Sequence, residues 1–136
     1  MSLFKKVIPA GLLTLSLSAT AAAAEVWICD FNDGTRRNTI PEKVLIDLKA
    51  DGTALVMDPF LVHFEQAPKQ AKFVKNMKNK LRVRWRVEDV EFQGGLATDM
   101  DFSLVHDKRR GKAFITLNLP SFDNQDSGTG TCAQKE

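Results

Sequence analysis

Hydrophobic and polar residues alternate along most of the chain after residue 24, and this period of two predicts β-strands. The clearest run is KLRVRWRVE (80–88), in which every second residue is apolar. One face of this strand should be buried while the other faces solvent. After Glu88 the apolar phase shifts to Val90, which predicts a β-bulge near Glu88 and Asp89. The expected buried face consists of Leu81, Val83, Trp85 and Val87.

Further alternating runs predict an antiparallel meander. They cover residues 25–31, 44–49, 54–58, 98–106 and 113–119, with a last short strand at about 128–133 and an early turn at 32–35. Pairing Leu104 with Ile115 and Phe102 with Leu117 would keep two apolar rows on one side of the sheet. A two-residue turn at Asp51-Gly52 would place Leu48 opposite Leu55 and Ile46 opposite Met57.

These runs predict an all-β protein, either a small meander barrel or a curved sandwich of about eight strands. Closure is favoured because it removes exposed strand edges. The segment QAPKQAKFVKNMKN (66–79) departs from the pattern, since Phe73, Val74 and Met77 fall on one side of a helical wheel. We therefore expect one short helix near residues 68–78, beginning at Pro68.

The first 24 residues have the features of a secretory signal peptide. Lys5 and Lys6 precede an apolar stretch, and small residues end at Ala24. The apolar stretch is shorter than the roughly 20 residues that span a bilayer, which disfavours the alternative of a membrane anchor. We expect cleavage after Ala24, or after Ala21 or Ala23, one domain at 25–136 without a transmembrane segment, and a periplasmic or secreted location.

Cleavage would change the charge of the protein. The full chain has 19 Lys and Arg against 17 Asp and Glu, and loss of Lys5 and Lys6 leaves 17 of each. The mature net charge is then about zero, so electrostatic function must come from how the charges are distributed.

Two cysteines, Cys29 and Cys132, lie near opposite ends of the mature chain. Export favours a disulfide between them, and closing so long a loop would stabilise the fold by about 4–5 kcal/mol in the chain-entropy model. A metal pair or a reactive thiol is the alternative, but there is no C-x-x-C motif and no histidine near either cysteine in the sequence.

The chain has few residues that could support catalysis. His63 and His106 are its only histidines, and neither lies at metal-ligand spacing. No nucleophile elbow, phosphate loop or zinc-protease motif is present. Asp99 and Asp101 would share one strand face, where they could act as acid and base, bind calcium, or neutralise cations on the next strand. We favour neutralisation, and expect no catalytic residue, no metal and no cofactor.

A basic tract is the strongest anomaly, since eight of the 18 residues from Lys69 to Arg86 are cationic and no acid lies between Glu65 and Glu88. The row of arginines suits carboxylate or phosphate ligands. Alternatively, these cations form an ordinary solvated face neutralised by Asp99 and Asp101. The candidate anion-binding residues are Arg82, Arg84 and Arg86, flanked by Lys69, Lys72, Lys75 and Lys78.

The expected partner is an anionic envelope component, namely a lipid head group, lipopolysaccharide or acidic polysaccharide, or else an acidic protein. Nucleic acid is not expected, because the protein is exported and the pattern shows no aromatic residues interleaved on the solvent face. A different class of function is a barrel with a small-ligand cavity lined by Trp27, Trp85 and Phe102.

The motif W-x-C at Trp27–Cys29, a C-terminal cysteine at Cys132 and the intervening strand rhythm resemble the small periplasmic inhibitors of C-type lysozyme. The resemblance implies a compact antiparallel barrel closed by a disulfide, and an inhibitory function as a further alternative. Those inhibitors carry a Ser-Gly-x-Arg-Tyr loop and a Trp-x-Lys-Gly segment, and this chain has neither, nor any tyrosine. No inhibitory residue can therefore be carried over, and the basic tract would repel a cationic lysozyme.

Overall fold

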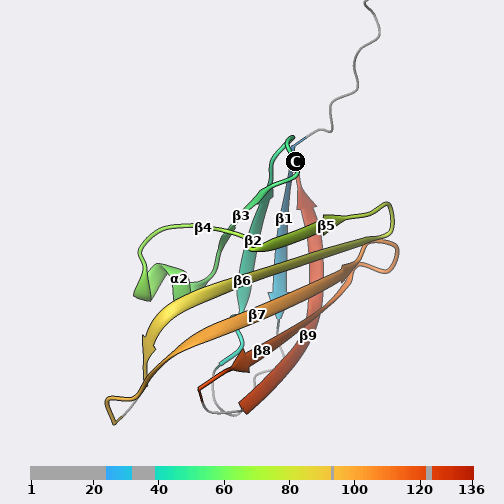
Figure 1. Ribbon diagram of the computed structural model, residues 1–136. Coiled ribbons are helices and arrows are strands. Elements are labelled where there is room, and N and C mark those ends of the chain that lie inside the picture. The colour runs from blue at the N-terminus through green and yellow to red at the C-terminus, as the bar shows by residue number, and fades with distance from the viewer. Residues whose placement is uncertain (1–23, 32–38, 93, 122–123) are drawn as a thin grey trace, which may run out of the picture.

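The computed structural model describes residues 24–31, 39–92, 94–121 and 124–136. The proposed signal peptide, except Ala24, and the turn expected at 32–35 lie outside these residues. The described chain forms nine antiparallel strands curled into a half-barrel, with one short helix (Figure 1). The predicted all-β class is thus confirmed.

The strands follow one another along the chain, and the helix falls between the third and the fourth. They are β1 (Glu25–Phe31), β2 (Lys43–Leu48), β3 (Ala54–Met57), α2 (Pro59–Phe64), β4 (Lys69–Gln70), β5 (Phe73–Asn76), β6 (Lys80–Glu91), β7 (Ala97–Asp107), β8 (Lys112–Leu119) and β9 (Asn124–Lys135).

The sheet has the order β4-β3-β2-β1-β9-β8-β7-β6-β5. Its two edge strands, β4 and β5, are consecutive in sequence and separated only by Ala71 and Lys72. The Ala71 amide donates to Ala54 O of β3 at 2.9 Å, and the Lys72 amide donates to Arg84 O of β6 at 2.8 Å. One short segment therefore bridges the two ends of the sheet, which leaves little free edge for pairing with other chains.

The two halves of the sheet cross at a steep angle. In Figure 1, β5 to β8 run across the front, and β1 to β3 and β9 run behind them. The apolar faces of both halves point inward and form the core. Trp85 stacks on Phe102 at 5.2 Å between ring centroids, and Phe102 stacks on Phe60 of α2 at 5.8 Å. The helix therefore covers one end of the core.

The predicted phase of β6 is confirmed. Leu81, Val83, Trp85 and Val87 are all buried. The predicted bulge is present as well, because the pairing with β7 shifts register between Val87 and Val90. Asp89 lies in this bulge with φ of 53°. The predicted pairs between β7 and β8, Leu104 with Ile115 and Phe102 with Leu117, are also found.

The register predicted for the β2–β3 hairpin is wrong by one residue. Leu48 pairs with Ala54 and Ile46 with Val56. The Lys49 amide donates to Thr53 O, so the loop contains three residues, with Gly52 at φ of 92°. A three-residue loop that ends in a left-handed glycine is a common hairpin connection, and here it directs Ala54 and Val56 inward.

The helix predicted near residues 68–78 is also wrong, because that segment forms β4 and β5. The helix is instead α2, at Pro59–Phe64. Its start has an identifiable signal: Asp58 accepts a hydrogen bond from the Leu61 amide at 2.8 Å, and Pro59 occupies the first turn. The apolar positions of 68–78 did not indicate a helix face, since Phe73 is exposed on the outside of the sheet.

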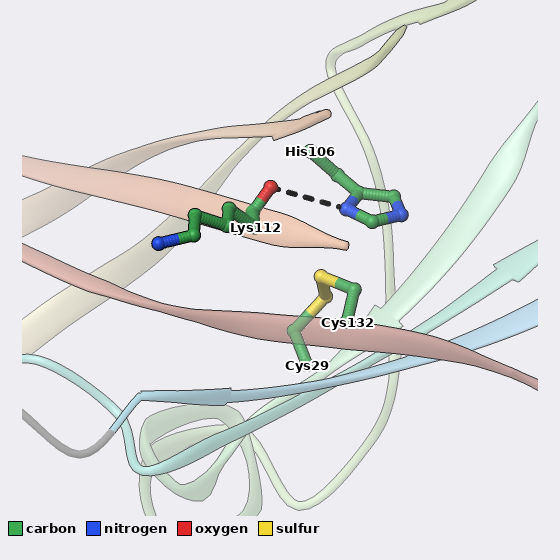
Figure 2. Close-up of a disulfide and its surroundings, with 4 residues drawn as sticks. All are labelled: Cys29, His106, Lys112 and Cys132. Atoms are coloured by element: carbon green, nitrogen blue, oxygen red, sulfur yellow. Dashed lines mark hydrogen bonds between the residues drawn. A yellow bond between two sulfur atoms is a disulfide. The ribbon is translucent and has the colours of Figure 1, made fainter. Parts of the chain in front are cut away.

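Cys29 and Cys132 form a disulfide, as predicted (Figure 2). They are directly opposite each other on β1 and β9, with a Cα–Cα distance of 3.9 Å. The first and last strands are therefore neighbours, joined by hydrogen bonds and a covalent link. This bond is compatible with an oxidising, exported location.

Candidate anion-binding face

The three predicted arginines share the outward face of β6, because buried residues alternate with them. Arg82 and Arg84 are exposed, whereas Arg86 is half-buried. On the neighbouring strand β5, Lys75 lies opposite Arg82 and Phe73 lies opposite Arg84. Residues directly opposite each other on antiparallel strands project from the same face, so the side chains of β5 and β6 form one surface.

Arg86 is neutralised by β7, as the alternative interpretation of the basic tract predicted. Its Nε donates to Asp101 Oδ1 at 2.6 Å and its Nη2 donates to Asp101 Oδ2 at 3.0 Å. Asp99 Oδ2 lies 3.4 Å from Nη1. The hydrogen bonds and charge of Asp101 raise the pKa of Arg86. The guanidinium of Arg86 is therefore already paired with carboxylates of the same chain.

Lys69 is also neutralised. Its Nζ lies 3.1 Å from Glu65 Oε2 and 3.2 Å from Glu88 Oε1. Partial burial alone would lower the pKa of Lys69, but the hydrogen bonds that its ammonium donates to Glu65 and Glu88 outweigh burial, and the pKa is raised. This cluster connects the end of α2 to the bulge of β6, a structural role. Lys78 lies apart from the arginines, in the turn between β5 and β6.

Four predicted residues remain together without an acidic partner among the described residues. They form the surface that we call the basic face: Lys72, Lys75, Arg82 and Arg84. Lys75 and Arg82 are directly opposite each other, and like charges in that position destabilise a sheet. An anion bound to the basic face would compensate these charges.

Phe73 lies within the basic face and was assigned incorrectly by the sequence pattern. The guanidinium carbon of Arg84 lies 5.3 Å from the centroid of its ring, a cation–π contact. Phe73 is 40% exposed and Phe114, on the outward face of β8, is 45% exposed. The expectation that the solvent face carries no aromatic residues is therefore wrong. The alternation in 113–119 contained the signal for Phe114, since it directs Ala113 and Ile115 inward.

A groove of about 470 Å³ runs over β5 to β8 beside the basic face. Its size falls within the range of small-molecule sites, about 300–1,000 Å³. Its lining combines cations, uncharged polar side chains and one carboxylate, Asp101, which pairs with Arg86. The lining includes Lys72, Phe73, Arg84, Ser103, Thr116 and Asn118. Sequence alone did not assign the last three, because uncharged polar side chains are ordinary on the solvent face of a strand.

The two histidines lie on different elements, His63 on α2 and His106 on β7. His106 is buried beside the disulfide, with Nδ1 3.3 Å from the carbonyl oxygen of Lys112 (Figure 2). A carbonyl can only accept, so Nδ1 carries the proton. Its Nε2 is buried without a partner in the described part of the structure. His63 lies on α2, with its ring edge-on to Phe64. Within the described ranges, no three metal-ligating side chains converge.

Two of the aromatic residues expected to line a ligand cavity, Trp85 and Phe102, border the groove beside the basic face, and both are buried. Trp85 stacks on Phe102 and donates its indole N–H to Asp58 Oδ2 at 2.7 Å. Trp27 packs against His106, with 4.7 Å between ring centroids. Trp85 and Phe102 therefore pack in the core beneath the groove, and the small-ligand alternative stays a prediction.

No protein-family model, curated protein or solved structure matches the chain. The likeness to lysozyme inhibitors therefore stays a prediction from the sequence. No helix in the described residues is long and apolar enough to cross a bilayer.

Proposed function

We propose that the protein is a non-catalytic, exported binding protein whose basic face contacts an anionic component of the cell envelope. The observation that carries this proposal is the grouping of Lys72, Lys75, Arg82 and Arg84 without acidic partners among the described residues. Arg86 and Lys69, by contrast, are matched by carboxylates of the same chain.

The distribution of charge supports this function more than its total does. After removal of the signal peptide, cations and anions would balance, so the protein as a whole attracts no polyanion. A local group of cations nevertheless creates a positive potential over distances up to the Debye length, about 8–10 Å at physiological salt. An anion bound there would also relieve the repulsion between Lys75 and Arg82.

Binding assays at several salt concentrations test the proposal. The probes are phosphatidylglycerol vesicles, lipopolysaccharide and polygalacturonate, with phosphatidylcholine vesicles as the neutral reference. We expect binding to at least one anionic probe and weakening with added salt. Binding that is absent from all anionic probes, or that does not depend on salt, would contradict the proposal.

Paired variants locate the surface. We expect Arg82→Ser/Arg84→Ser to weaken binding by roughly tenfold or more, since charge-assisted contacts contribute about 1.5–3 kcal/mol each. The control is Arg109→Ser/Arg110→Ser, which removes the same charge from an exposed turn between β7 and β8. Equal losses in both variants would show that only the overall charge matters and would overturn the assignment of the basic face.

A further inference from the structure

A second groove, of about 600 Å³, lies on the same outer surface of the sheet. It lies over β6 to β9, next to the groove at the basic face. Its lining includes Lys80, Val105, Asp107, Lys112, Phe114 and Thr129. Asp107 is engaged by its own turn, where it accepts the Arg109 amide at 3.0 Å.

The two grooves follow one another along the same strands. On β8, Asn118 and Thr116 line the first groove, and Phe114 and Lys112 line the second. On β7, Ser103 lines the first groove and Val105 the second. From Lys112 to Asn118 the strand extends about 20 Å, at a rise of roughly 3.3 Å per residue. A ligand that filled both grooves would therefore be an extended chain lying along β7 and β8.

Each groove contains one carboxylate that its own chain engages, Asp101 through Arg86 and Asp107 through its turn. Beside it, both grooves offer the same three kinds of chemistry. The first has the cations Lys72 and Arg84 and the exposed ring of Phe73. The second has the cations Lys80 and Lys112 and the exposed ring of Phe114. Hydroxyl side chains complete each groove: Ser103 and Thr116 in the first, and Thr129 and Thr131 in the second.

Each of these groups matches one part of an acidic sugar. Cations bind its carboxylate, sulfate or phosphate, and hydroxyl side chains bond its hydroxyl groups. An exposed aromatic ring can cover the apolar face of a sugar ring. The set occurs twice on the outer surface, once over β5 to β8 and once over β6 to β9, and this repetition matches a ligand that repeats along its length.

We propose that the tandem grooves bind one chain of an acidic polysaccharide, an inference that rests on the proposed function of the basic face. A lipid surface fits this arrangement less well. Bilayers engage protruding apolar side chains flanked by cations, whereas here the rings line depressions that also contain threonine, serine and asparagine.

Calorimetric titration with oligogalacturonates of increasing length, from one sugar to six, tests the inference. We expect affinity to rise with length until both grooves are filled, and maltohexaose, the neutral reference, not to bind. Phe114→Ser should abolish the advantage of the longer oligomers while leaving the shorter ones unaffected. Val62→Ser, which removes another exposed apolar side chain, on α2, should change nothing.

Each other outcome is informative. Salt-dependent binding to phosphatidylglycerol vesicles without binding to any oligogalacturonate would overturn the saccharide inference and leave the proposed function standing. Binding that is the same for all lengths would overturn the tandem arrangement. If no anionic probe binds, both proposals fail. An unchanged thermal midpoint for Phe114→Ser shows that a loss of binding does not arise from unfolding.

Discussion

The two carboxylate oxygens of Asp58 accept hydrogen bonds from two different elements, α2 and β6. Oδ1 accepts the Leu61 amide at the start of α2, and Oδ2 accepts the indole N–H of Trp85 in β6. Burial raises the pKa of Asp58, although both hydrogen bonds oppose this shift by favouring the charged form. One buried side chain thus attaches the helix to the core of the sheet.

Replacing Asp58 by alanine should therefore lower the free energy of unfolding by about 2–3 kcal/mol. The variant loses a helix N-cap and leaves a buried indole donor without a partner. Urea denaturation followed by tryptophan fluorescence measures the change. Asp47→Ala is the control, because it removes only an exposed ion pair with Lys49 and should cost less than about 1 kcal/mol. Similar losses in the two variants would contradict this role.

His106 is a buried side chain with one unsatisfied nitrogen. Burial lowers its pKa, with a smaller contribution from the nearby charge of Lys108. In the unfolded chain the same group titrates near 6.5. Between these two pKa values the unfolded state binds a proton and the folded state does not, so the fold loses stability as the pH falls below about 6.5.

We expect the wild type to lose stability more steeply than His106→Phe on acidification from pH 7 to pH 5. The difference in slope is at most about 1.4 kcal/mol per pH unit, the value for one proton. Chemical denaturation at each pH measures it. Asp58 has a raised pKa and acts in the opposite direction in acid, which is why the comparison with His106→Phe is needed. Parallel pH curves would show that His106 does not contribute.

At the scale of elements, the sequence predicted best where apolar and charged residues alternate strictly. In β6 a shift of one residue would bury the arginines. Only one assignment was therefore possible, with Leu81 to Val87 placing their apolar side chains on the buried face. The β2–β3 hairpin was predicted less well, because its register depends on whether Asp51-Gly52 makes a two- or three-residue loop. The helix was misplaced because the prediction followed the apolar positions of 68–78, whereas the signal of the real helix is the N-cap Asp58 followed by Pro59.

The pairing of β1 with β9 requires glycine at position 130. A Cβ added to Gly130 would collide with the backbone carbonyl oxygen of Asp30 and lie 2.8 Å from Phe31 Cδ1. Backbone cannot move aside as a flexible side chain can. Gly130→Ala should therefore cost about 3 kcal/mol or more in thermal or urea unfolding.

Gly128→Ala is the matched control on the same strand. An added Cβ there meets the side chain of Ile40 at 3.1 Å and that of Ile115 at 3.7 Å. Small movements of these side chains relieve the contact, so the cost should stay near 1 kcal/mol. If the two variants were equally stable, the close approach of β1 and β9 at Gly130 would be refuted.

At the scale of the molecule, the disulfide joins strands 103 residues apart in sequence. Reduction removes a constraint on the unfolded chain and so increases its conformational entropy. The free energy of unfolding should fall by about 4–5 kcal/mol, which corresponds to a decrease of roughly 15–25 °C in the thermal midpoint. Calorimetry with and without dithiothreitol measures it. Cys29→Ala/Cys132→Ala should not respond to the reductant, and a wild-type midpoint that does not respond either would contradict this expectation.

The candidate site was only partly accessible from the sequence. The outward arginines followed from the alternation in β6, but their availability depended on register: Arg86 lies opposite Asp101, whereas Arg84 lies opposite Ser103. The grooves could not be predicted, because each one extends over four neighbouring strands and depends on how the sheet curves there. Alternation fixes which side a residue faces, but not where side chains of several strands leave a depression.

The disulfide also determines how the molecule would respond to a pulling force. The start of β1 lies beside the end of β9, so tension applied at Glu25 and Lys135 would separate the two strands one pair at a time. Three pairs, from Val26 to Ile28, precede the link at Cys29. Beyond them the load would pass through a covalent bond, and the rest of the sheet would carry none of it until that bond was reduced.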